Sequence, residues 1–157
     1  MVTGKQPKGF AYLWLLGILL VMSLLMGKAV DVSSTQAERQ REEEVLAVGD
    51  TYRRAITHYI EMPGSNGQYP QRLEDLVQDP RFPNPVRHLR KLYPDPETGQ
   101  PWEPIVAPGG GIMGVRSTSA RKPWKQQGFP ARYKEFGDAT TIAEWQFTYQ
   151  AANKPKS

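Results

Sequence analysis

The chain has 157 residues, a formal net charge of +4 and no cysteine. The missing cysteine excludes disulfides, thiol catalysis and thiolate metal sites. Basic residues are interleaved with acidic ones from Lys5 to Lys156, which favours a solvated surface over a nucleic-acid interface. We expect one modest domain and no nucleic-acid partner.

The longest uncharged run comprises residues 10–27, FAYLWLLGILLVMSLLMG. A transmembrane helix needs about 20 predominantly apolar residues, with a range of roughly 17–25. Lys5 and Lys8 precede the run, and positive charge there favours a cytoplasmic amino terminus. The run is therefore interpreted as membrane-directed, with three alternatives: a removed secretory signal, a single-pass anchor, or a leader cut on its cytoplasmic side.

Residues 28–62 are predicted to continue this helix in amphipathic form. Apolar positions recur in steps of three and four and define one buried stripe: Val45, Val48, Tyr52, Ala55 or Ile56, and Tyr59. Glu42, Glu43 and Glu44 are interpreted as a solvated helix face. Gly49 costs the helix about 1 kcal/mol relative to alanine, and Pro63 with Gly64 ends it.

Residues 63–157 are predicted to form a loop-rich domain, because all prolines except Pro7 lie there. Short helical segments are expected at 71–78 and at 86–92, the latter with Leu89 and Leu92 facing inward. Glycines 109–111 predict a hairpin reversal, and alternation around Phe147 predicts a half-buried strand. The fold class is thus α+β: a long amino-terminal helix packed on a small antiparallel sheet of two to three strands.

No group of residues predicts catalysis or a cofactor. His58 and His88 lack a second ligand at helical spacing, so a structural role is favoured over metal binding. Asp95, Glu97 and Thr98 carry oxygens that suit calcium, yet their spacing favours a plain turn over a metal loop. We therefore expect neither an enzyme nor a bound metal.

The amino-terminal region resembles the type IV pilin-like proteins, and in particular the type II secretion pseudopilins. The similarity lies in a short basic leader ending in Lys8-Gly9, followed at once by Phe10 and a hydrophobic helix. It extends to the order of later features: Tyr69-Pro70, a short helix, Tyr93-Pro94, Trp102 and a glycine-rich hairpin.

This resemblance implies cleavage between Gly9 and Phe10 by a prepilin peptidase, followed by N-methylation of Phe10. Residues 1–9 would be the leader and residues 10–27 the transmembrane and assembly helix, which contacts lipid and other pilin-like subunits. The protein would be single-pass in a bacterial inner membrane, with a periplasmic domain. Family members usually carry a glutamate where this chain has Trp14, which implies a minor, tip-proximal subunit.

Two alternatives stay open at this stage. Gly27-Lys28-Ala29 fits a small-x-small signal-peptidase site, and cutting there would release a secreted binding protein. An uncleaved anchor would instead hold a binding protein on the periplasmic side of the membrane.

Overall fold

The computed structural model describes the backbone of residues 9–151 and the side chains of residues 11–23 and 36–151. The elements are, in chain order, α1 (Gly9–Glu61), the 3₁₀ helix η1 (Leu73–Leu76), β1 (Glu103–Val106), β2 (Ile112–Arg116), the 3₁₀ helices η2 (Ala131–Asp138) and η3 (Ile142–Glu144), and β3 (Gln146–Thr148). The chain divides into two compact units, residues 1–38 and 39–157, and α1 contributes to both.

In the first unit, the described residues all belong to α1. No helix that the described residues form is both long and apolar enough to span a bilayer. The leader predicted for residues 1–9 falls outside the described residues except for the backbone of Gly9, and the side chains of residues 24–27 fall outside them too.

In the second unit, the rear of α1 is amphipathic as predicted. One face is buried in the domain core through Val45, Tyr52, Ala55, Ile56, Tyr59 and Ile60. The helix ends at Glu61, just before Pro63, and this end is confirmed. The Ser65 hydroxyl then donates a hydrogen bond to the carbonyl of Ile60 and satisfies one of the terminal helix acceptors.

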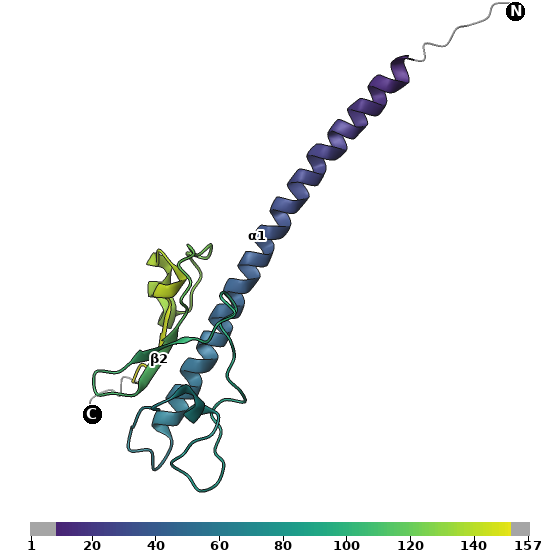
Figure 1. The fold of residues 1–157 in the computed structure, drawn as a ribbon. Helices are drawn as coiled ribbons and strands as arrows, with labels where there is room; N and C mark the ends of the chain where they lie inside the picture. The colour runs from purple at the N-terminus through teal and green to yellow at the C-terminus, as the bar shows by residue number, and fades with distance from the viewer. Residues whose placement is uncertain (1–8, 152–157) are drawn as a thin grey trace, which may run out of the picture. The chain divides into compact units, whose positions relative to one another are not determined.

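The strands form one antiparallel sheet in the order β1-β2-β3. Between β1 and β2 the chain reverses through Gly110 and Gly111, which both have positive φ, and the Ala107 amide donates to the Gly111 carbonyl. Figure 1 shows the rear of α1 beside the sheet that contains β2. The α+β class and the small antiparallel sheet are confirmed, with three strands.

The core between sheet and helix is aromatic. Trp145 and Phe147 are fully buried, while Gln146 between them is exposed, so the period-two prediction for this strand is confirmed. A Cβ on Gly49 would lie 2.4 Å from the Phe147 ring. Gly49 is thus more than a weak point in the helix, because it provides the space that the Phe147 ring occupies.

Two local predictions need correction. Residues 71–78 contain only the 3₁₀ turn η1 and not an α-helix. Residues 86–92 form no helical turn, and only Leu89 is buried there, whereas Leu92 is 38% exposed. The reason is long-range: the amides of His88 and Leu89 both donate to the Leu76 carbonyl, so these amides bond to η1 and not within a local helical turn.

Candidate functional site

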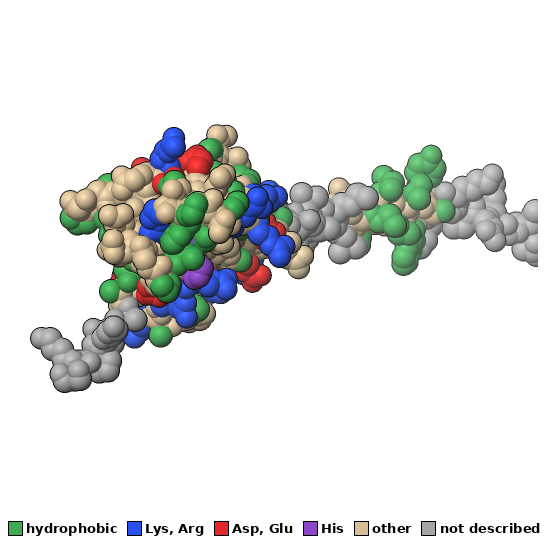
Figure 2. All heavy atoms as spheres, turned by 90° about the horizontal axis from the view of Figure 1, so that it is seen from below, with side chains coloured by type: hydrophobic (Ala, Val, Ile, Leu, Met, Phe, Trp, Pro, Cys, Tyr) green, Lys and Arg blue, Asp and Glu red, His purple; other side chains and the backbone are tan. Residues whose placement is uncertain are grey.

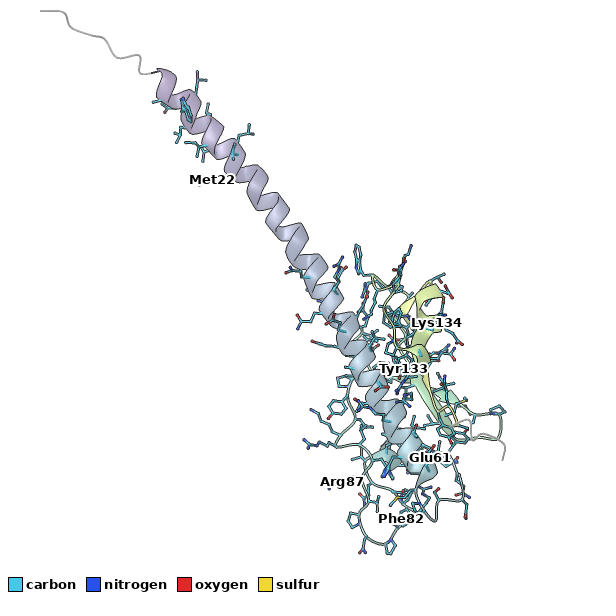
Figure 3. The ribbon with its side chains drawn as sticks, turned by 180° about the vertical axis from the view of Figure 1, so that it is seen from behind. Met22, Glu61, Phe82, Arg87, Tyr133 and Lys134 are labelled. Carbon is cyan, nitrogen blue, oxygen red and sulfur yellow. The ribbon has the colours of Figure 1, made fainter. Side chains whose placement is uncertain are left out.

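The first candidate site is the apolar front of α1, defined here as residues 11–23. Its large side chains are exposed all along the segment: Tyr12, Leu13, Trp14, Leu15, Leu16, Ile18, Leu19, Leu20, Val21 and Met22. Trp14 is 65% exposed. Figure 2 shows hydrophobic side chains on more than one side of this part of the helix, and Figure 3 shows Met22 projecting from it. Exposed apolar surface of this extent marks a contact surface for lipid or protein.

The other residues predicted for this region are Gly9 and Phe10. Their backbone forms the first turn of α1, but the Phe10 side chain lies outside the described residues. Trp14 is therefore the predicted assembly residue whose surroundings the structure describes. Its described neighbours on the helix, residues 11–23, include no acidic residue.

Glu42 departs from its predicted role. It is 1% exposed, and its carboxylate accepts hydrogen bonds from the backbone amides of Trp124 and Lys125 at 2.8 and 2.9 Å. Arg121 lies 3.0 Å from the same carboxylate. The interpretation of Glu42 as part of a solvated face is wrong, because it is the anchor that holds the 121–125 segment on α1. Glu43 and Glu44 are exposed as expected.

The Asp95 turn is closed by its own hydrogen bonds. The Asp95 carboxylate is buried and accepts from the Glu97 amide, the Thr98 hydroxyl and the Ser117 hydroxyl. Glu97 is paired with Arg121, whose pKa is raised mainly by that hydrogen bond. This geometry supports the plain turn. Among the side chains that the structure describes, no three His, Asp or Glu groups converge to hold a metal ion.

A second candidate site joins residues that no sequence pattern connects. His58 of α1 and His88 meet with their Nδ1 atoms 2.8 Å apart. His88 Nε2 lies 3.0 Å from Asp79 Oδ2, and both side chains are fully buried. The histidines are 30 positions apart in the sequence, so no local pattern indicates this pairing.

Arg81 completes this cluster. Its Nε and Nη2 donate to the two oxygens of Asp79, its Nη2 also donates to the Tyr59 carbonyl, and its guanidinium lies 3.5 Å from the centre of the Tyr59 ring. Burial alone would raise the pKa of Asp79, but hydrogen bonds from Arg81 and His88 lower it to about 2. Asp79 is therefore an ionised acceptor at neutral pH.

Tyr133 carries a third polar contact between the carboxy-terminal half and α1. Its hydroxyl donates to Asp50 and accepts from Arg53 at 2.9 Å, and burial followed by the Asp50 contact raises its pKa to about 12. Tyr133 points toward α1 in Figure 3. This contact fixes η2 on the helix.

Two open grooves of about 470 and 450 Å³ flank Lys125. One is lined by Arg39, Glu43 and Trp124 among others, and the second by Leu46, Ala47 and Tyr133 among others. The side chains that line them include no serine, threonine or histidine, so neither groove offers a hydroxyl nucleophile with an imidazole base.

Comparison with known proteins adds no assignment: no family model, no curated protein and no solved structure matches the chain.

Proposed function

We propose that this protein is a pilin-like structural subunit of a type II secretion or type IV pilus-like assembly, processed between Gly9 and Phe10. Its role is assembly and not catalysis. In this proposal, residues 10–27 insert in the bacterial inner membrane with the amino terminus in the cytoplasm, and the domain stands in the periplasm.

The observation that carries the proposal is the surface of residues 11–23. Ten large apolar side chains there are exposed, and no acidic or basic side chain interrupts them. At about 25 cal/mol per Å² of buried apolar area, leaving such a surface in water is strongly unfavourable, so lipid or other apolar helices must cover it. A removable signal would need only a 7–15-residue apolar segment, whereas the run extends to Gly27.

A second support is that the same helix also forms part of a folded domain. Residues beyond 39 bury an apolar face under a three-stranded sheet. The same helix begins at Gly9, so a cut after Ala29 would divide one continuous helix within its length. Helix and sheet in this combination suit a subunit that is anchored and built into a larger array.

Trp14 supports assignment as a minor subunit. A glutamate at this position would be able to pair with the charged amino terminus of a neighbouring subunit inside the bilayer, and an unpaired ammonium there is costly. The indole of Trp14 offers no negative charge. The proposed position is therefore near the tip, where no earlier subunit requires neutralisation.

Processing can be tested with a pair of glycine variants in cells that express a prepilin peptidase. Gly9→Val places a branched side chain at the proposed cleavage bond and is expected to leave the leader attached. Gly17→Val is the matched control, since nothing lies within 4 Å of a Cβ at Gly17, and it is expected to be processed normally. Normal processing of Gly9→Val would contradict the proposal.

The subunit class has its own test. Replacing Trp14 by glutamate is expected to change how much of the protein enters a co-expressed pilin-like fibre, measured by quantitative immunoblotting of sheared fibres. Trp14→Phe keeps an apolar ring and serves as the control. Equal incorporation of both variants and the wild type would contradict the minor-subunit assignment and leave the processing proposal standing.

A further inference from the structure

His58 and His88 form a pair that is open to solvent on one side and held by the fold on the other. His58 is exposed on the rear of α1, whereas the His88 side chain is fully buried. Their Nδ1 atoms lie 2.8 Å apart. Figure 2 shows a histidine side chain, in purple, at the surface of the domain, and since the chain has only two histidines this side chain belongs to the pair. Solvent therefore reaches the pair.

The contacts of His88 fix the position of its hydrogen. Nε2 of His88 lies 3.0 Å from Oδ2 of Asp79, and Arg81 donates hydrogen bonds to both oxygens of that carboxylate. An ionised carboxylate only accepts, so Nε2 of His88 carries the hydrogen of the neutral ring. Nδ1 of His88 is left with a lone pair on the side where His58 lies.

Metal-binding histidines are held in this same way. A ligating imidazole almost always donates its second N–H to a carboxylate, a backbone carbonyl or water, which fixes its tautomer and the direction of its ring. Asp79 accepts this hydrogen from His88, and Arg81 in turn holds Asp79. The amides of His88 and Leu89 both donate to the Leu76 carbonyl, which fixes the backbone of the ligand. His88 is therefore oriented as a ligand by the fold itself.

His58 can supply the second ligand. A neutral imidazole carries its hydrogen on either nitrogen, so His58 donates to His88 in one tautomer and presents a lone pair at Nδ1 in the other. Zinc–nitrogen bonds of about 2.0–2.1 Å at a tetrahedral angle place two ligand nitrogens about 3.3 Å apart. The observed 2.8 Å has to widen by about 0.5 Å for that geometry, and rotation of the exposed His58 side chain provides it.

From this geometry we propose that His58 and His88 bind one divalent transition-metal ion, of the Zn²⁺, Cu²⁺ or Ni²⁺ class, through their two Nδ1 atoms. Imidazole suits these ions, whereas Mg²⁺ and Ca²⁺ prefer oxygen ligands. Asp79 stays outside the coordination shell, so the site has two protein ligands, and water fills the remaining positions. The site goes beyond the proposed assembly function and does not depend on it.

A bound ion would fasten the segment before His88 to α1. His58 belongs to α1, and His88 follows the proline-rich residues 79–86. The ion replaces one hydrogen bond between the two rings by a coordinate bond to each. Asp79 and Arg81 form an ion pair at 2.6 Å, so together they bring no net charge against the cation. Because the two ligands meet only in the folded chain, the ion is expected to stabilise the fold.

Zinc titration of the full chain in detergent, without a histidine tag and at about pH 7.5, tests the site, because an ordinary imidazole is neutral there. Calorimetry is expected to show one Zn²⁺ bound per chain, and NMR is expected to show shifted ring signals of both histidines. These are the only imidazoles in the chain, so their signals are unambiguous as a pair. Mg²⁺ is the control ion and is expected to shift neither ring. A lack of saturable Zn²⁺ binding, or binding that leaves either ring unshifted, would overturn the proposal.

A pair of variants on α1 separates ligation from general attraction of a cation. His58→Ala removes the exposed ligand and is expected to weaken Zn²⁺ binding by at least about tenfold, the lower end of what even an outer-shell partner contributes. Glu44→Gln removes an exposed acidic group and is expected to bind Zn²⁺ as the wild type does. Unchanged affinity in His58→Ala would overturn the proposal, and so would an equal loss in Glu44→Gln.

Unfolding gives a second measurement of the same site. Saturating Zn²⁺ is expected to raise the urea midpoint of the wild type, because the ion binds the folded chain, and to leave the midpoint of His58→Ala unchanged. An equal rise in both proteins would show that the ion binds elsewhere and would overturn the proposal.

Discussion

The front and the rear of α1 share one helical backbone and differ completely in what their side chains contact. Residues 11–23 expose every large apolar side chain, whereas the rear buries one apolar face in the domain and exposes charged residues such as Glu43 and Glu44 on the other. Apolar side chains on all sides of a helix are buried by lipid or by other helices, whereas the single apolar face of an amphipathic helix packs on its own domain. The contrast teaches that the rear stabilises the fold, while the front leaves its apolar surface uncovered by the described residues of its own chain.

The comparison is tested most strongly by tryptophans, one in each region. Trp145 is fully buried, stacks on Phe136 and donates to the Phe136 carbonyl, so Trp145→Ala is expected to lower the free energy of unfolding by about 3–5 kcal/mol. Trp14→Ala is expected to change it by less than about 0.5 kcal/mol. Urea unfolding of the full chain in detergent, followed by near-ultraviolet circular dichroism, measures both. Equal effects would remove the distinction between the regions.

The domain should also carry an acid-sensitive contribution to stability from Asp79. Its folded pKa of about 2 lies below the ordinary value of 3.8, so the unfolded chain binds the proton first. The stabilisation is complete above pH 3.8 and is lost as pH falls toward about 2, on the order of 2 kcal/mol in total. Asp79→Asn is expected to flatten this part of the unfolding profile, and Asp138→Asn, at an exposed position, to leave it unchanged. Identical profiles for the two variants would contradict the assignment.

Two glutamates on the rear of α1, Glu42 and Glu44, give a sharper version of the same contrast. Glu42→Gln removes the charge that pairs with Arg121 and replaces one of the two carboxylate oxygens that accept from the Trp124 and Lys125 amides, so a loss of about 2 kcal/mol is expected. Glu44→Gln, exposed two residues away, is expected to cost less than about 0.5 kcal/mol. The same urea experiment compares the two variants. If Glu42→Gln were as stable as Glu44→Gln, the Glu42 carboxylate would contribute no more to stability than a solvated side chain.

The smallest expected effect concerns two glycines of one helix. Alanine at Gly49 gains about 1 kcal/mol of helix propensity but forces a Cβ against the buried Phe147 ring, so a net loss of about 1 kcal/mol is expected. At Gly17 nothing lies within 4 Å of the added Cβ, and Gly17→Ala is expected not to destabilise the domain. A Gly49→Ala variant that unfolds at higher urea than the wild type would show that Phe147 moves freely.

Features with a local cause were predictable from the sequence. Pro63 ended the helix, the stripe that contains Tyr52 and Ile56 marked its buried face, and the alternation around Phe147 identified a strand. Each depends on a period or on backbone chemistry within a few residues.

Features with a distant cause were not predictable in this way. Glu42 is buried because Arg121 and two amides reach it from about 80 residues further along the chain. His58 and His88 looked like separate structural histidines, since nothing near either one indicates that the fold brings them into contact. The expected inward position of Leu92 failed for the same reason, because Leu76 fixes the preceding backbone.

The central claim, a pilin-like subunit cut at the cytoplasmic end of the apolar helix, is tested most directly by mass spectrometry of the mature amino terminus. The protein would be purified from membranes of cells that contain an active prepilin peptidase. The account predicts a chain that begins with N-methylated Phe10. A chain that begins at Val30, or one found only in its intact Met1 form, would contradict it.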